Sequence, residues 1–319
     1  MNEPMKSTAT RPVAPTDAAD APSQTESARL RKEVVSVHDQ PPGHWVGDGF
    51  AVRSLFSYSE MGAETSPFLL LDYAAPREFP PSKQRRGVGE HPHRGFETVT
   101  ICYAGEVEHR DSGGHAGRIG AGDVQWMTAA SGVVHEEMHS REFTERGGVM
   151  EMAQLWVNLP AELKMSKPRY QEIVSTDVPV VPLGADGGAG TARIIAGSLQ
   201  TVSGPARTFT PLNVWDVRLN EGGRAELPIP AGHSTTLALF GGAVRINDGP
   251  ALEAVRIVLL DRVGDHVVLE ATKESKLLVL TGEPIDEPIV GYGPFVMNHQ
   301  GEIHQAMVDY RSGRMGHLS

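Results

Sequence analysis

Short strand-like runs, rather than helical periods, dominate this chain. Runs of apolar and β-branched residues recur along it, and Gly, Pro, Asp or Ser separates most of them. The first half contains GFAVRSLFS, FLLLDYA, FETVTICYAG, DVQWMTA, GVVHEEMHS and MAQLWVNLP. The second half contains RTFTPLNVWDVRL, HSTTLALFGGAVRI, VRIVLLDRV, DHVVLEA and SKLLVLTGEP. Many short strands joined by turns predict an all-β fold.

The size of the chain and a faint internal repeat favour two such units. A chain of 319 residues is comfortable for two domains. Its 35 glycines and 23 prolines exceed the usual shares of roughly 7% and 5% and suit a turn-rich β protein. The spacing of Gly105 and Gly122 resembles that of Gly242 and Gly264, each second glycine being followed by Asp. We therefore expect two similar β-barrels in tandem.

The domain boundaries follow from composition. Residues 1–28 are rich in Ala, Pro, Thr, Ser and Asp and have almost no large apolar side chains, which predicts a disordered tail. We expect an N-terminal domain over residues 29–162 and a C-terminal domain over residues 163–319. The polar segment 160–173, PAELKMSKPRYQEI, is expected to cross between them.

Helical spacing stands out near the end of the chain. In GEIHQAMVDYRSG, the apolar residues Ile303, Met307 and Tyr310 recur at helical intervals. A short amphipathic helix is therefore expected there.

Charge and cysteine content exclude some classes of function. A formal net charge of −11 argues against direct binding to nucleic acid or to an acidic membrane, although it permits a small-molecule substrate or a protein partner. The single cysteine, Cys102, rules out an internal disulfide and is expected to be a buried, inert thiol. No stretch approaches the ~20 apolar residues of a membrane span, and the first residues lack a signal-peptide core. We expect a soluble cytoplasmic protein.

Two pairs of polar residues carry the candidate chemistry. His91 and His93 stand two residues apart in EHPHRGFETVT, and His135 and Glu137 stand two apart in GVVHEEMHS. In a strand, side chains at i and i+2 point to the same face. If the two segments lie side by side, their four side chains can reach one metal ion.

The donor set narrows the choice of metal. Imidazoles and a carboxylate, with room for water, suit Fe(II), Mn(II), Ni(II) or Cu(II), and zinc is a further possibility. The absence of thiolates from the set argues against a closed structural zinc site. Open coordination positions would make the site reactive rather than structural.

The carboxylate ligand has two candidates. Glu97 shares strand parity with His91 and His93, unless Gly95 interrupts the strand between them. Glu137 shares parity with His135. Spacing alone does not choose between Glu97 and Glu137.

Three further histidines lie close by in the sequence. His109, His115 and His139 are most simply interpreted as solvated or hydrogen-bonded residues. Of these, His139 keeps the parity of His135 and Glu137, so it would lie near the site if that strand continues.

These residues resemble the two signature motifs of the cupin superfamily. The first motif, His-x-His followed by Glu and Gly, is matched by His91, His93, Glu97 and Gly105, with one extra residue before the glycine. The second is matched by Gly122, Gly132 and His135, with Thr128 where proline is usual and a spacing two residues longer.

The departures from the general cupin pattern resemble one family, the pirins. PFLLLDY, HPHRGFETVT, GDVQWMTA, GVVHEEM, QLWVNLP and GPFVMN are similar to pirin motifs and occur in pirin order, over about residues 30 to 315. This resemblance implies a bicupin: two tandem double-stranded β-helix (jelly-roll) barrels with short helices. It also implies a single iron, most simply Fe(2+), in the N-terminal barrel.

The resemblance assigns the site residues. The implied metal ligands are His91, His93, His135 and Glu137. Glu97 then becomes a candidate for holding a ligand imidazole through its far nitrogen. The C-terminal half has no His-x-His pair, and its His233 stands alone, so that barrel is expected to lack a metal.

The resemblance also implies an activity. Several bacterial pirins are similar to quercetin 2,3-dioxygenases, oxidoreductases that open a flavonol ring with O₂. A flavonol-like aromatic substrate would bind through its 3-hydroxyl, with the metal as Lewis acid and Glu137 as catalytic base. A different enolic substrate is a variant of this hypothesis. The alternative is a non-enzymatic, iron-dependent regulatory partner of a transcription factor or a metabolic enzyme.

Two features near the histidines have both a functional and a structural interpretation. The loop from Pro76 to Glu90 contains a basic run, KQRR, which either shapes the mouth of the site or is a solvated surface. The side chains of Phe96, Trp126 and Met127 either line a substrate cavity or belong to the core.

Overall fold

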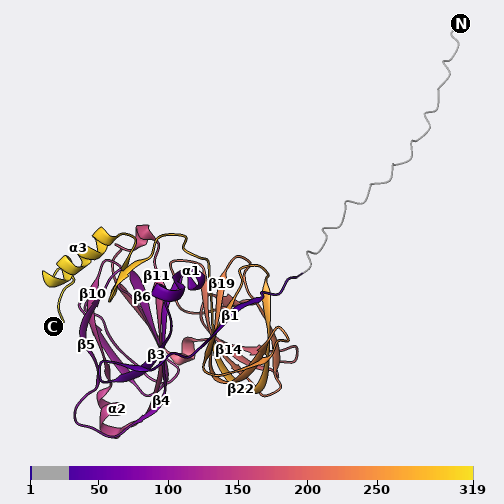
Figure 1. The fold of residues 1–319 in the computed structure, drawn as a ribbon, viewed down its shortest axis with the longest axis horizontal. Coiled ribbons are helices and arrows are strands. Elements are labelled where there is room, and N and C mark those ends of the chain that lie inside the picture. Colours follow the sequence, from indigo (N-terminus) through magenta and orange to yellow (C-terminus); the bar gives the residue numbers. More distant parts are fainter. Residues whose placement is uncertain (2–28, 319) are drawn as a thin grey trace.

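Two β-domains side by side make up the described part of the protein (Figure 1). The structure is a computed structural model that describes Met1 and residues 29–318, so the tail expected over residues 1–28 lies, Met1 apart, outside the described residues. The helical segments are short, as expected of an all-β chain: α1 (Tyr58–Thr65), α2 (Arg141–Arg146), α3 (Gln300–Arg311), and the 3₁₀ turns η1 (Ala161–Leu163) and η2 (Ser175–Asp177). Within the described residues, none of the helices combines the length and the apolar composition that crossing a bilayer requires.

The N-terminal domain contains two antiparallel sheets. The larger has the order β12-β9-β6-β11-β4-β3-β2, and the smaller has the order β5-β10-β7-β8. Their strands are β2 (His44–Val46), β3 (Phe50–Ser57), β4 (Phe68–Phe79), β5 (Gly87–His93), β6 (Phe96–Ala104), β7 (Val107–Asp111), β8 (Ala116–Ile119), β9 (Val124–Thr128), β10 (Val133–His139), β11 (Gly148–Asn158) and β12 (Arg169–Ile173). The strand runs predicted for the first half are confirmed.

The C-terminal domain is built around one nine-stranded sheet. Its main path is β1-β21-β19-β22-β17-β14-β13, with β18 on β22 and β20 on β19. The strands are β1 (Val34–Asp39), β13 (Val180–Leu183), β14 (Gly190–Ala196), β17 (Leu212–Leu219), β18 (Arg224–Pro228), β19 (Ser234–Ile246), β20 (Ala251–Glu253), β21 (Arg256–Leu260) and β22 (His266–Gly282). Two small ribbons pair β15 (Ser198–Leu199) with β16 (Val202–Ser203), and β23 (Val290–Tyr292) with β24 (Phe295–Met297). The runs DHVVLEA and SKLLVLTGEP form one long strand, β22, rather than two.

Each domain packs with a segment from the opposite end of the chain. Strand β1, at the start of the described chain, pairs with β21 of the C-terminal sheet, while α3 lies over the N-terminal domain beside β10 (Figure 1). Strand β12, in the segment expected to be a crossover, instead pairs with β9 and belongs to the N-terminal sheet. The boundary expected after residue 162 stays a prediction, and hydrogen bonds cross it.

Strand β6 of the large N-terminal sheet is buried on both faces. Along β6, Val99 and Ile101 point to a core cluster that also contains Val214 and Leu278 of the C-terminal domain. Tyr73 stacks on Phe240 across the same interface, with ring centroids 4.1 Å apart. The alternate residues of β6 point the other way, into the N-terminal barrel.

The interiors of the two barrels differ. The C-terminal barrel is filled by apolar side chains, among them Trp215, Leu237 and Val279. The N-terminal barrel instead buries a hydrogen-bonded group of polar side chains, Thr100, Gln125, Glu137 and Gln154. Because buried polar groups require partners, this group indicates where a site is located.

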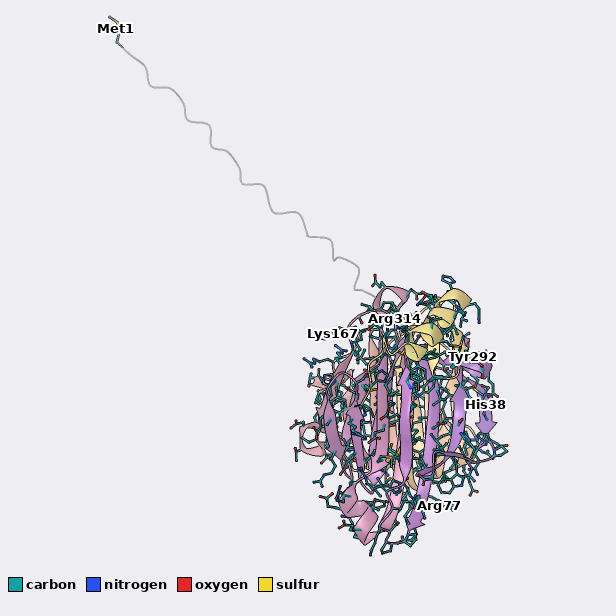
Figure 2. The ribbon with its side chains drawn as sticks, turned by 90° about the vertical axis from the view of Figure 1, so that its left-hand side faces the viewer. Met1, His38, Arg77, Lys167, Tyr292 and Arg314 are labelled. Atoms are coloured by element: carbon teal, nitrogen blue, oxygen red, sulfur yellow. The ribbon has the colours of Figure 1, made fainter. Side chains whose placement is uncertain are left out.

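The C-terminal helix is confirmed, with a different buried face from the one expected. Ile303 is fully buried, and Ala306 and Asp309 are also buried, whereas Tyr310 is 40% exposed. Figure 2 shows Arg314 and Tyr292 at the α3 end of the molecule and Arg77 at the opposite end. The helix therefore lies at the end of the N-terminal domain that contains the segment after His93. Arg94, in that segment, donates a hydrogen bond to Asp309 of the helix.

Candidate metal centre

Three histidines converge in the N-terminal barrel. Strand β10 pairs with β5 so that His135 lies directly opposite His91. One ring nitrogen from each of His91, His93 and His135 lies within 4.8 Å of the others. The i, i+2 spacing placed His91 and His93 on one face, and the antiparallel register brings His135 to them. That the group binds a metal remains a prediction.

The nitrogen atoms of this group fit a cation. His93 Nδ1 and His135 Nε2 are buried and have no hydrogen-bond partner among the described residues. His91 Nδ1 lies 2.8 Å from the carbonyl oxygen of Gly89, so it carries the proton and leaves Nε2 free to coordinate. Buried, unpartnered nitrogens are costly, and a metal ion would satisfy them.

The histidines are electrostatically suited to coordination. Burial, and then the neighbouring imidazoles, lower the pKa of His93 and of His135 well below the ordinary value. Neutral imidazole is the form that binds a metal. At neutral pH, His93 and His135 therefore do not have to release a proton before coordinating.

Glu137 lies in the same barrel interior but is held by other groups. Its carboxylate accepts hydrogen bonds from Thr100 Oγ1 at 3.0 Å, Gln125 Nε2 at 2.5 Å and Gln154 Nε2 at 2.7 Å. Within the described part of the chain, the compact group of possible ligands comprises the three histidines and does not include Glu137. Its role as a ligand thus stays a prediction.

Glu97 does not support the site, contrary to expectation. Strand β5 ends at His93 and β6 begins at Phe96, so strand parity does not continue through Gly95. Gly95 has φ +92°, and a Cβ there would lie 1.9 Å from Val296 O, so only glycine fits this break. Glu97 points to the domain interface, where its Oε1 accepts from Thr128 Oγ1 at 2.6 Å and lies 3.7 Å from Arg169 Nη2.

The Glu97→Gln substitution is expected to remove a pH dependence of stability. Burial raises the pKa of Glu97 to about 7, despite hydrogen bonds and the charge of Arg169. The folded state therefore binds a proton between about pH 4.5 and 7, so stability present at low pH is lost as pH rises through this range. Relative to the wild type, the glutamine variant should gain up to about 3 kcal/mol between pH 5 and pH 8. Urea unfolding at both pH values measures this difference, and parallel curves would contradict it.

The other histidines divide into two kinds. His139 Nε2 lies 3.0 Å from Gly49 O, and the rings of Phe50, Phe79 and Phe143 surround the imidazole, so His139 is a core residue as expected. His109 differs, because its Nδ1 lies 3.3 Å from His135 Nδ1. His109 is hydrogen-bonded, as expected, because its Nε2 lies 3.2 Å from Asp111 Oδ2, but it also adjoins the histidine group. Its i, i+2 spacing from Asp111 was the available signal.

The three apolar residues near the histidines belong to core clusters, which is one of the two roles expected for them. Phe96 contacts His93, with ring centroids 5.1 Å apart, but it is fully buried in a core cluster with Leu69 and Val296. Trp126 belongs to the core between the domains, and Met127 packs with Tyr170. Trp156, which was not predicted to lie at the site, has its ring centre 5.4 Å from that of His93 and 4.3 Å from that of Phe96. Neighbouring residues of a strand point to opposite faces, and Leu155 points into the core between the domains. The sequence QLWVN could therefore have indicated that Trp156 points into the N-terminal barrel.

The basic loop is shorter than expected and its arginines have local partners. Only residues 80–86 separate β4 from β5. Arg85 pairs with Glu108 and donates to His139 O at 3.0 Å, and Arg86 lies over the ring of Phe79. Arg85 lines a cleft of 620 Å³ whose walls also carry Glu108, His109 and Glu136. Lys83 is exposed. The run is thus mostly a paired and solvated surface.

Cys102 is fully buried, and burial raises the pKa of its thiol to about 12. This confirms the expectation of an inert side chain, because the reactive thiolate is disfavoured.

Comparison with known proteins shows the family of the chain and agrees with its fold. The pirin family model matches residues 49–157, and the pirin C-terminal cupin domain model matches residues 214–316. A Pseudomonas aeruginosa protein, provisionally named a quercetin 2,3-dioxygenase, is 55% identical over 283 residues, which is 89% of this chain and 98% of that protein. Mouse pirin is 37% identical over 276 residues, covering 85% of this chain and 89% of its own.

A solved structure agrees with these matches. The quercetin 2,3-dioxygenase of Acinetobacter baumannii, at 1.88 Å resolution, superposes with a TM-score of 0.88 at 50% identity, covering 91% of this chain and 100% of that chain. The chain is therefore a member of the pirin family, with two cupin domains.

Proposed function

We propose that this protein is a metal-dependent dioxygenase that cleaves flavonols such as quercetin with O₂. The observation that carries the proposal is the group of His91, His93 and His135, two of whose nitrogens are buried without partners. The names of the Pseudomonas and Acinetobacter relatives support the same reaction class. The proposed partners are thus a small aromatic substrate and O₂.

The residues present fit one divalent transition metal. His91, His93 and His135 would hold it through imidazole nitrogens, and Glu137 would add a carboxylate oxygen, a donor set suited to Fe(2+). When bound, the metal supplies Lewis acidity toward a substrate hydroxyl and a redox-active partner for O₂. A pirin of Escherichia coli, 19% identical and alike in fold, is described in complex with nickel(II). Nickel should therefore be tested beside iron, manganese, copper and zinc.

Glu137 is the proposed catalytic base. A carboxylate offers about four acceptor positions; Thr100 and Gln125 use two on Oε1, and Gln154 uses one on Oε2. One position on Oε2 remains for the proton of the substrate hydroxyl or for a metal. When Glu137 holds the metal, its carboxylate must detach or pivot to take the substrate proton at this position.

Trp156 is the proposed aromatic contact of the substrate. Its ring packs against His93 and is only partly buried, so a flat substrate near the three histidines can stack on it. His91 is only partly buried, whereas His93 is 4% exposed and His135 is fully buried. Substrate is therefore expected to approach from the side of His91.

The Glu137→Gln variant tests both the reaction and this role. Metal-free protein would be loaded anaerobically with Fe(II) and mixed with quercetin and air, and the loss of flavonol absorbance followed. The wild type should turn over, and the variant, compared at equal metal content, should be slower by about 100-fold or more because its amide is not a base. A matched Glu172→Gln exchange makes the same carboxylate-to-carboxamide change at an exposed position of β12 and should leave turnover unchanged.

Tight metal binding without turnover would overturn the dioxygenase proposal. It would leave the non-enzymatic, metal-dependent regulatory role as the remaining hypothesis. Equal turnover by wild type and Glu137→Gln would retain the reaction and remove Glu137 as its base.

A further inference from the structure

A chain of hydrogen-bonding groups extends from His135 into the small sheet. Strand β7 pairs with β10 so that Asp111 lies opposite His135. His109 Nδ1 lies 3.3 Å from His135 Nδ1, and His109 Nε2 lies 3.2 Å from Asp111 Oδ2. The side chains of His109 and Asp111 are 0% and 2% exposed. Water therefore does not compete for these contacts.

With His109 neutral, the chemistry of the two rings allows one consistent assignment of protons. A carboxylate only accepts, so His109 Nε2 must donate to Asp111. In a neutral ring, His109 Nδ1 is then an acceptor and receives the proton of His135 Nδ1. His135 Nε2, which is buried and has no partner among the described residues, is left with its lone pair free.

We infer that Asp111 and His109 are positioning residues that fix the tautomer and the ring orientation of His135, so that Nε2 points its lone pair into the histidine group. The inference rests on the metal site of the proposed function, but not on the dioxygenase reaction. Partners of this kind commonly orient ligating histidines through the nitrogen that does not bind the metal. Here the carboxylate acts through an intervening imidazole.

The orientation of Asp111 is itself determined. Its Oδ1 accepts from the backbone N–H groups of Gly113 at 2.8 Å and His115 at 3.1 Å. Oδ2 is therefore the oxygen turned toward His109. His115 Nδ1 also lies 3.1 Å from each carboxylate oxygen. The two backbone donors favour one orientation of an amide at this position, with its carbonyl oxygen toward the loop and its NH₂ toward His109.

The face of the His109 ring packs against an aromatic side chain. Tyr170 of β12 stacks on it, with centroids 4.8 Å apart and planes 13° apart. Gly117, opposite His109 on β8, makes room for this tyrosine, because a Cβ there would lie 2.3 Å from its hydroxyl oxygen. The imidazole is thus held in plane as well as by its two nitrogens.

The Asp111→Asn substitution should reverse the proton arrangement. The new NH₂ would donate to His109 Nε2, which moves the His109 proton to Nδ1. His135 Nδ1 must then accept, and its proton moves to Nε2, where it blocks coordination. Long-range ¹H–¹⁵N NMR of the metal-free protein should show His135 protonated on Nδ1 in the wild type and on Nε2 in the variant. Affinity for Zn(II) or Ni(II), measured against a competing chelator, should fall 10- to 100-fold.

A matched control and a second pair of variants separate this effect from a general defect. Asp186→Asn makes the same chemical change at an exposed turn of the C-terminal domain, where Oδ1 accepts from Gly188 N, and should leave affinity unchanged. His109→Gln can accept from His135 and donate to Asp111, so it should stay within about threefold of the wild type in affinity, whereas His109→Phe should not. This comparison remains informative if Asp111→Asn fails to fold.

Each result bears on a different claim. The same His135 tautomer in wild type and Asp111→Asn, or equal affinities of His109→Gln and His109→Phe, would overturn the inference. A wild type that binds no metal, with His135 still protonated on Nδ1, would instead overturn the proposed function and leave the positioning contact established.

Discussion

His135→Ala is expected to abolish stoichiometric metal binding. His135 is fully buried, lies opposite His91 across the β5–β10 pair, and presents Nε2 without a partner among the described residues. Its removal deletes a ligand outright, so the loss of affinity should exceed the roughly 10- to 100-fold typical of losing a ligand's hydrogen-bond partner. Flavonol turnover should disappear with it.

Thermal unfolding with and without metal measures this loss independently of activity. A metal at about 100 times its dissociation constant stabilises the wild type by about 2.7 kcal/mol, and the variant should show almost none of this gain. His304→Ala, which removes an exposed histidine on α3, controls for adventitious binding and should behave as the wild type. Metal-induced stabilisation that survives in His135→Ala would place the binding site elsewhere.

Asp309→Ala is expected to give the largest loss of stability among the variants considered. Arg94 Nη1 donates to Asp309 Oδ2 at 2.7 Å, and the two side chains are only 5% and 12% exposed. This ion pair ties α3 to the residue that follows His93. Removing the carboxylate leaves a buried, unpaired guanidinium, which costs roughly 3–5 kcal/mol. Urea unfolding of the metal-free protein measures it.

Two further variants test that the buried charge is the cause. Arg314 contacts the same carboxylate from a side chain that is 54% exposed, so Arg314→Ala should cost less than about 1 kcal/mol. Adding Arg94→Met to Asp309→Ala should recover part of the loss, because no buried charge is then left unpaired. If Asp309→Ala and Arg314→Ala were equally harmful, the explanation would be wrong.

Glu97 and Glu137 show the limit of predicting the direction of a side chain from residue spacing. Both Glu97 and Glu137 keep parity with a histidine, but parity holds only within an unbroken strand. The break at Gly95 is set by the close approach of Val296, 201 residues further along the chain. A contact so distant in sequence could not be predicted from the segment around Glu97. The side to which Glu97 points was therefore unpredictable as well.

The residues that position His135 could not be predicted from the sequence either. His109 and Asp111 lie on β7, Tyr170 lies on β12, and all three converge only because β7 pairs with β10 and β12 pairs with β9. In the sequence, His109 resembles any polar residue of a short strand, and Tyr170 lies in a segment that resembles a linker. Their roles depend on register, which is a property of the sheet and not of either strand.

By itself, the sequence determined the strand-rich architecture, the pairing of His91 with His93, the helix near the end and the inert Cys102. Each of these follows from local periodicity or composition, which is readable within a few residues. Only the tertiary structure decided that His135 faces His91, that Glu97 turns to the domain interface, and that β1 and α3 each pack on the domain at the other end of the chain. Those outcomes depend on contacts between residues far apart in sequence, whose partners no local pattern specifies.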